Sequence, residues 1–149
     1  MTRISFLHGA ADRIQSAAQW LHNTWGERQS PLPALLVYVP DAEQAARLDR
    51  LLWTQPPLAF LPHCRIDSPL AGETPILLTD NLDRNPDAPR QECWLLNLGN
   101  TLPATFSRFE HLVEIVSTDD ADRLPARDRF KFYRERGYAI DNRDISGGW

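Results

Sequence analysis

Residues 34–53 read ALLVYVPDAEQAARLDRLLW, and this stretch decides the fold. Ala34 to Val39 form a continuous apolar run of strand length, which is typical of a strand buried on both faces of a sheet. Pro40 and Asp41 then favour a helix start, because proline is tolerated in the first turn and an acidic side chain suits the positive end of the helix dipole. The predicted helix ends near Trp53, and its apolar side consists of Ala45, Leu48, Leu51 and Leu52.

Further elements are predicted on both sides of this stretch. Alternating or apolar runs predict strands at residues 3–7, 76–79, 93–98 and 112–116. Apolar residues at helical spacing, and suitable end residues, predict helices at 10–25, 103–109 and 119–136. The remaining pieces are a short extended segment at 60–61, a surface loop at 80–91 and a partly flexible C-terminal tail at 138–149. Strands that alternate with helices predict one α/β domain, residues 1–149, with a mostly parallel sheet and helices on both faces.

The composition indicates a soluble globular domain. The chain has 149 residues, of which 42% are hydrophobic and 24% charged, and these ordinary globular values disfavour a disordered chain. No apolar run approaches the roughly 18–20 residues that a membrane span needs, and the first residues do not resemble a signal peptide. Two cysteines, Cys64 and Cys93, are too few for a disulfide scaffold. We expect a cytoplasmic protein that makes no contact with a membrane.

The basic charge is concentrated in one segment. The chain has a net charge of −4, which disfavours a cationic nucleic-acid binder, and 15 of its 16 basic residues are arginine. Residues 123–136 hold six cations and two anions and so carry +4, which leaves −8 for the rest. Because arginine presents a planar fork to carboxylates and phosphates, this segment predicts a local anionic partner.

The turn after the first predicted strand does not suit a nucleotide. It reads His8-Gly9-Ala10-Ala11-Asp12, with a single glycine. Phosphate binding at this turn needs glycine-lined backbone at a helix start, and the chain has neither G-x-G-x-x-G nor a Walker A motif. The sequence therefore predicts no nucleotide cofactor.

Candidates for metal binding and catalysis are weak. His63 and Cys64 are adjacent, so on an extended chain their side chains point in opposite directions and rarely share a metal. Cys93 lies in a predicted buried strand and is expected to be a small core residue. The loop acids are expected to be solvated; these are Asp80, Asp83 and Asp87. We predict no metal, no cofactor and no catalytic residue.

The last predicted helix carries the clearest binding pattern. At about 100° per residue, its basic residues and one aromatic fall within one sector of about 100°; these are Arg123, Arg127, Phe130, Lys131 and Arg134. Phe130 lies where this stripe meets the apolar side, an arrangement that suits a ligand with a carboxylate and a hydrophobic side chain. The alternative is a solvated basic face beside a core aromatic. Pro125 lacks a backbone donor, so it predicts either a helix that begins near it or a kink. If the helix begins near Pro125, Arg123 precedes the helix and its place in the stripe is insecure.

A second pattern combines a helix end with a proline-rich loop. Trp53 ends the second helix, and Phe60 and Pro62 follow a Pro56-Pro57 loop. Tryptophan and phenylalanine are frequent anchors of protein interfaces, so these residues predict a partner surface. The alternative is that they cap the edge of the core.

Together these segments resemble the chi subunit of the bacterial DNA polymerase III holoenzyme. The resemblance is carried by residues 46–53 (ARLDRLLW), 60–63 (FLPH) and 126–134 (ARDRFKFYR), followed by Gly137-Tyr138. It extends over nearly the whole chain in length and order of elements. No single motif is specific, but their joint spacing is.

The resemblance implies a Rossmann-like domain without nucleotide binding and a non-catalytic accessory subunit. It implies that a chi-like chain pairs with the psi subunit of the clamp loader and grips the C-terminal tail of single-stranded DNA-binding protein (SSB), so that DNA is contacted only indirectly at the replisome. An XPD-like helicase is implied as a competing partner on the psi surface. The implied SSB-tail residues are Arg123, Arg127, Phe130, Lys131, Arg134 and Val116, and the implied psi or helicase residues are Trp53, Phe60 and Pro62.

Two other functions remain open on the sequence. The first is an SSB-tail adaptor that serves an XPD-like repair helicase instead of the clamp loader. The second is a small nucleotide-dependent enzyme with an atypical phosphate loop, which the single glycine of the first turn disfavours.

Overall fold

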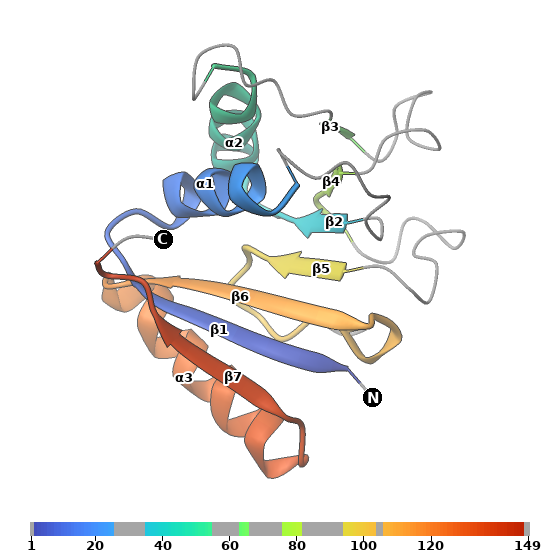
Figure 1. Cartoon of the computed structure of the whole chain (residues 1–149), viewed down its shortest axis with the longest axis vertical. Helices are drawn as coiled ribbons and strands as arrows, with labels where there is room; N and C mark the ends of the chain where they lie inside the picture. The colour runs from blue at the N-terminus through green and yellow to red at the C-terminus, as the bar shows by residue number, and fades with distance from the viewer. Residues whose placement is uncertain are drawn as a thin grey trace.

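The computed structural model describes residues 2–25, 35–54, 63–65, 76–81, 94–103 and 106–147. These residues form one seven-stranded sheet with three α-helices (Figure 1). The elements in chain order are β1 (Arg3–Ala10), α1 (Arg13–Trp25), β2 (Leu35–Tyr38), α2 (Ala42–Thr54), β3 (His63–Arg65), β4 (Ile76–Thr79), β5 (Trp94–Asn97), the 3-10 turn η2 (Phe106–Arg108), β6 (His111–Ser117), α3 (Asp120–Glu135) and β7 (Ile140–Asp144).

The sheet is entirely parallel. The strand order is β3-β4-β2-β5-β6-β1-β7, and each neighbouring pair runs in the same direction. All carboxyl ends of the strands therefore lie along one edge, which is where open α/β sheets bind ligands.

The apolar run at residues 34–39 contains a central strand of the sheet, β2. Leu35 and Val37 belong to the hydrophobic cluster on one face of the sheet, and Leu36 belongs to the cluster on the other face. The prediction of a strand buried on both faces is confirmed for 35–38. The helix predicted after it is confirmed as α2, with Ala45, Leu48 and Leu52 buried.

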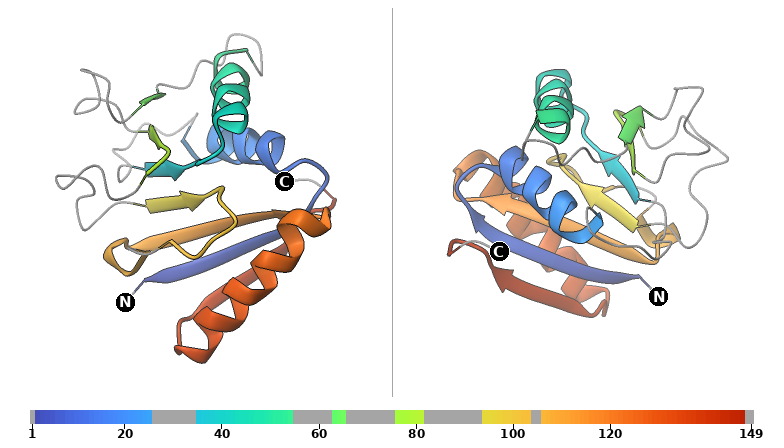
Figure 2. Two further views of the ribbon diagram at one scale, coloured as in Figure 1. Left: turned by 180° about the vertical axis from the view of Figure 1, so that it is seen from behind. Right: turned by 45° about the horizontal axis from the view of Figure 1, so that its top comes forward.

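Helices cover both faces of the sheet, as predicted. The helices α1 and α2 lie on one face, and α3 crosses the other face over β1 and β6 (Figure 2). The residues of α1 and α2 pack in one hydrophobic cluster, whereas Ala126 and Tyr133 of α3 pack in the second with Phe6 and Phe106. The fold class, a Rossmann-like parallel α/β sheet, is thereby confirmed.

The predicted C-terminal tail is wrong for residues 140–144, which form the edge strand β7. Ile4 to His8 of β1 pair with Ile140 to Asp144 in register. The strand was missed because IDNRD has no alternating apolar pattern, and four of its five residues are exposed. Gly137, with φ at 82°, ends α3 in the left-handed conformation and lets the chain turn back towards the sheet.

Two smaller differences concern short elements. The helix predicted at 103–109 is a single 3-10 turn at Phe106–Arg108. The strand β3, which was not predicted, pairs with β4 alone among the described residues. The calls on Phe60, Pro62, Asp83, Asp87 and Cys93 lie outside the described residues. Within the described ranges, no helix is long and apolar enough to cross a bilayer.

Candidate functional site

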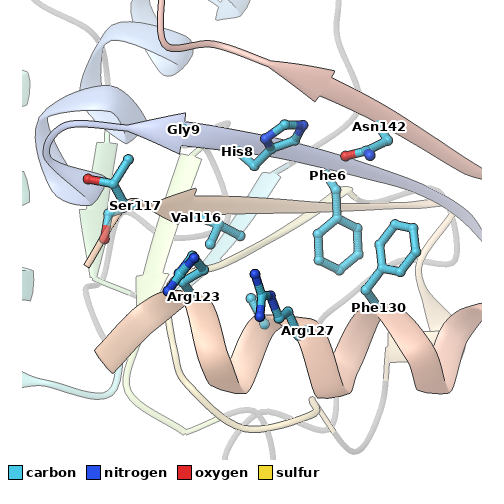
Figure 3. Close-up of a pocket in the computed structure, with 11 residues that line it drawn as sticks. Phe6, His8, Gly9, Val116, Ser117, Arg123, Arg127, Phe130 and Asn142 are labelled. Carbon is cyan, nitrogen blue, oxygen red and sulfur yellow. The ribbon is translucent and has the colours of Figure 1, made fainter. Parts of the chain in front are cut away.

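A pocket of about 460 Å³ lies between α3 and the sheet, within the range of about 300–1,000 Å³ that small-ligand sites have. Residues from the carboxyl halves of β1 and β6 and from β7 line it together with α3, as Figure 3 shows. Its lining combines an apolar floor, two arginines and a polar far wall: Phe6, His8, Gly9, Val116, Ser117, Thr118, Arg123, Ala126, Arg127, Phe130 and Asn142.

The helix α3 begins early enough to place Arg123 inside it. Asp119 is the N-cap residue, and its side chain accepts a hydrogen bond from the backbone N–H of Ala121. Asp120 begins the helix, so Pro125 lies in its interior and not in the first turn. Of the two alternatives for Pro125, a helix start near it is wrong, and Arg123 keeps its place in the cationic stripe.

Phe130 lies at the boundary between the buried and the exposed side of α3. Ala126, Arg129 and Tyr133 are buried, whereas Arg127 and its neighbours on the stripe are exposed. The half-buried ring of Phe130 meets the ring of Phe6 edge to face, with 5.1 Å between centroids. Aromatic pairs favour this geometry, and it gives the pocket an aromatic floor.

The cationic rim of the pocket has two arginines in different states. Arg123 forms an ion pair with Asp120 one turn earlier on the helix surface. Arg127 is exposed and has no hydrogen bond or ion pair to another residue within the described ranges. Arg127 is therefore the guanidinium that is free to bind an incoming carboxylate.

The structure brings together four of the six residues that the resemblance implied for tail binding: Val116, Arg123, Arg127 and Phe130. Lys131 and Arg134 are exposed further along α3 and do not line the pocket. They extend the positive stripe away from the pocket towards the end of the helix.

Sequence reasoning missed the far side of the pocket. Phe6 and His8 come from β1, and Asn142 from β7 lies in register beside Phe6 (Figure 3). Phe6 was predicted only as part of a strand, and Asn142 was assigned to the tail. Parallel pairing of β7 with β1 was the missing information, and the polar sequence of β7 gives no signal for it.

A buried ion pair fixes α3 to the sheet beside the pocket. Arg129 Nε donates to Glu114 Oε2 on β6 at 2.6 Å, and both side chains are almost fully buried. Burial raises the pKa of the Glu114 carboxyl, and the charge and hydrogen bond of Arg129 oppose that shift. Burial, followed by the charge of Glu114, raises the pKa of the Tyr133 hydroxyl. The ion pair thus links α3 directly to β6, and Arg129 precedes Phe130, which lines the pocket.

The turn after β1 is already filled by the chain itself. Gly9 has φ at 83°, and a Cβ there would come within 2.7 Å of Asp144 Oδ1. The carboxylate of Asp12 accepts hydrogen bonds from the backbone N–H groups of Ile14 and Gln15 and pairs with Arg47. The first N–H groups of α1, which bind phosphate in nucleotide-binding relatives of this fold, therefore have an internal anion.

Trp53 is exposed at the end of α2. Its side chain is 58% accessible, so the alternative that it caps the core edge is wrong. Its ring meets that of His63 edge to face at 5.8 Å, and His63 Nε2 lies 2.8 Å from Asp49 Oδ1. The helix α2, which carries Trp53, lies on the sheet face opposite α3 (Figure 2). His63 and Cys64 join no cluster of three or more potential metal ligands in the described part of the chain.

Fold and pocket together define a class of protein: a parallel α/β domain that carries a cationic, apolar-floored pocket under its last helix instead of a glycine-rich phosphate loop. Comparison with known families identifies the member of that class. The family described as "DNA polymerase III chi subunit, HolC" matches residues 1–141. The chain belongs to this family of accessory subunits of DNA polymerase III.

Three curated relatives carry the description "DNA polymerase III subunit chi". The protein from Pseudomonas aeruginosa is 32% identical over 148 residues, which is 95% of this chain and 96% of that protein. The Escherichia coli protein is 26% identical over 130 residues, covering 87% and 86%. The Haemophilus influenzae protein is 28% identical over 111 residues, covering 74% and 75%. The similarity thus covers most of each chain.

Proposed function

We propose that this chain is a non-catalytic adaptor of the replicase: the pocket under α3 binds the C-terminal tail of SSB, and the surface around Trp53 binds the psi subunit of the clamp loader. The observation that carries the proposal is the combination, in one pocket, of a free Arg127 with the aromatic floor of Phe6 and Phe130. An SSB tail is acidic and ends in an apolar residue with a free carboxylate, so it matches both halves of the pocket.

The chemistry assigns a role to each part of the site. The fork of Arg127 suits the terminal carboxylate, and the apolar floor suits the last side chain. Lys131 and Arg134, exposed beyond the pocket, are placed to attract the acidic residues that precede the end of the tail. Such a site needs no direct contact with DNA, in keeping with a net charge of −4.

An adaptor must hold two partners at once, and the positions of the two surfaces support this. Trp53 is on α2, which lies on one face of the sheet, and Arg127 is on α3, on the other face (Figure 2). A partner bound at one surface leaves the other uncovered. The proposed psi-binding surface includes Phe60 and Pro62 together with Trp53.

The proposal is tested by binding of a synthetic SSB C-terminal peptide and by co-purification from a native cell extract. We expect the peptide to bind with its carboxylate free and to lose most of its affinity when that carboxylate is amidated. We expect SSB and clamp-loader subunits to co-purify with the tagged chain. Recovery of an XPD-like helicase without clamp-loader subunits would replace psi as the partner, and absence of peptide binding would reject the pocket assignment.

A further inference from the structure

His8 is a titratable residue in the pocket wall that faces α3. It lies near the carboxyl end of β1, is half-buried, and lines the same pocket as Arg123 and Arg127 (Figure 3). Its backbone is held on the β7 side, because His8 pairs in register with Asp144 and the N–H of Ile145 donates to the His8 carbonyl at 2.8 Å. On the other side, the pairing of β1 with β6 is irregular between Leu7 and Ala10. His8 is therefore on an ordered strand and not on a flexible loop.

We propose that His8 completes the anion site of this pocket: its imidazole takes up a proton when a peptide carboxylate binds beside Arg127, so that binding is tighter at lower pH. The inference rests on the proposed function, since it concerns the same peptide and the same pocket. It adds a charged binding residue from β1 to a site whose arginines come from α3, and it makes occupancy depend on pH.

The charges around His8 determine how a bound carboxylate affects protonation of the imidazole. From α3, Arg123 and Arg127 line the same pocket as His8. Asp144 of β7 is its register partner, and the pKa of that carboxyl is lowered mainly by the hydrogen bond from the Ser146 N–H, with a smaller contribution from His8. The strand β6 contributes the uncharged Ser117. The pocket thus holds two arginines on α3, and the register partner of His8 on β7 is an aspartate.

Two further charged groups lie nearby but are already paired. Glu114 of β6 is buried against Arg129, and Asp122 of α3 accepts a hydrogen bond from Ser117 Oγ at 2.6 Å and lies 3.6 Å from Arg13 Nη1. Neither carboxylate is available to compensate a positive charge on His8. A peptide carboxylate therefore brings a new negative charge next to His8, and this charge favours the protonated imidazole.

The pH range separates His8 from the other charged groups of the complex. Arginine stays protonated throughout, and aspartate and terminal carboxyl groups are ionised above about pH 5. Histidine is the side chain whose ordinary titration falls between about pH 5 and 8. The other described histidines are elsewhere: His22 on α1, His63 on β3 and His111 at the amino end of β6. A change in affinity within this range that is lost when His8 is replaced is therefore assigned to His8.

The test is calorimetric titration of the full-length chain with the SSB C-terminal peptide at constant salt, from about pH 5.5 to 8, in two buffers of different ionisation enthalpy. We expect affinity to rise about tenfold as the pH falls, the change that corresponds to one unit of pKa shift, with proton uptake on binding. His8→Gln should lose both the rise in affinity at lower pH and the proton uptake.

Lys131→Gln is the matched control, because it removes a positive charge from α3 outside the pocket. It should weaken binding at every pH and leave the pH dependence intact. His8→Asn serves as a second variant if the thermal melt of His8→Gln shows loss of folding. A wild-type affinity that does not change with pH, or a rise that persists in both His8 variants, overturns the inference and leaves the proposed function standing. Absence of peptide binding at every pH rejects the proposed function itself.

Discussion

Arg127 and Arg134 lie two turns apart on the exposed stripe of α3, and only Arg127 lines the pocket. Sequence spacing made the two residues equivalent. The structure separates them, because the α3 residues that line the pocket lie between Arg123 and Phe130, whereas Arg134 is in the last turn of the helix. Direct contact with a terminal carboxylate and attraction along an exposed stripe differ in strength. The two arginines should therefore differ when each is removed.

We predict that Arg127→Ala weakens binding of the SSB C-terminal peptide by about 1.5–3 kcal/mol, the range for hydrogen bonds to charged groups. Arg134→Ala should cost about 1 kcal/mol or less, as expected for an exposed ion pair, and its effect should shrink as salt is raised. Fluorescence anisotropy at two salt concentrations measures both. Arg143→Ala, which removes an exposed arginine of β7 outside the pocket, is the control. Equal losses for Arg127 and Arg143 would remove Arg127 from the site.

A comparison of Gly9 with Gly137 distinguishes the cost of backbone strain from the cost of a close contact. Both have φ near 82°, but a Cβ on Gly9 would meet Asp144 Oδ1 at 2.7 Å, whereas one on Gly137 would meet nothing within 4 Å. Gly137→Ala should cost about 1–2 kcal/mol of stability, the penalty for an L-residue in the left-handed region. Gly9→Ala should cost more than that, because the turn of Asp144 and Ser146 must also move. Urea denaturation compares the two variants, and equal costs would contradict the contact.

At the scale of elements, the strength of the apolar signal decided what could be predicted. The strands β2, β4 and β6 are buried and apolar, and the sequence placed them within one or two residues. The helices α1, α2 and α3 have apolar sides at helical spacing and were placed within three residues at each end. The edge strands β3 and β7 are short or polar and each pairs with one neighbour among the described residues. Their positions depend on backbone pairing, which leaves no pattern in the side chains.

The difference between a pattern within one element and pairing between elements also explains why only half of the pocket was predicted. The stripe on α3 is a property of one helix, so spacing alone revealed Arg123, Arg127 and Phe130. The opposite wall depends on which strands are neighbours, and the pairing of β1 with β7 brings residues more than 130 positions apart into one wall. A sequence pattern without pairing information cannot bring His8 and Asn142 together.

The attachment of α3 to β6 gives a prediction at this scale. Removing one partner of a buried ion pair leaves an uncompensated charge and costs about 3–5 kcal/mol, whereas replacing both partners with apolar residues of similar volume is often neutral or stabilising. Arg129 and Glu114 form such a pair at 2.6 Å. We therefore expect Glu114→Met and Arg129→Met each to destabilise the chain strongly, and the double variant Glu114→Met with Arg129→Met to recover most of the loss.

Urea denaturation of the four proteins gives the coupling between the two residues. The double variant should also bind the SSB peptide, since Arg129 and Glu114 do not line the pocket. Additive losses in the two single variants would mean that the pair is not coupled. A stable double variant that no longer binds peptide would mean that the ion pair sets the rotation of α3 in a way that packing alone does not.

On the scale of the whole molecule, the two candidate surfaces are separated by the sheet. The pocket under α3 is lined from β1, β6 and β7, whereas Trp53 at the end of α2 contacts His63 of β3. The strand β3 is at one edge of the sheet, and β7 is at the other (Figure 1). No contact between residues of α2 and α3 is needed to form either surface. An adaptor built in this way should lose one partner at a time when one surface is changed.

We predict that Trp53→Ala abolishes or strongly weakens psi binding and leaves SSB-peptide binding unchanged, whereas Arg127→Ala does the reverse. Truncating an aromatic interface anchor often costs about 2 kcal/mol or more, roughly thirtyfold in affinity. Because Trp53 is 58% exposed, its removal creates no core cavity, and the melting temperature should remain close to that of the wild type. Calorimetry with each partner and a thermal melt of each variant provide the three measurements. Joint loss of both partners with a lowered melting temperature would mean that Trp53 supports the fold, and retained psi binding in Trp53→Ala would move the psi interface to another surface.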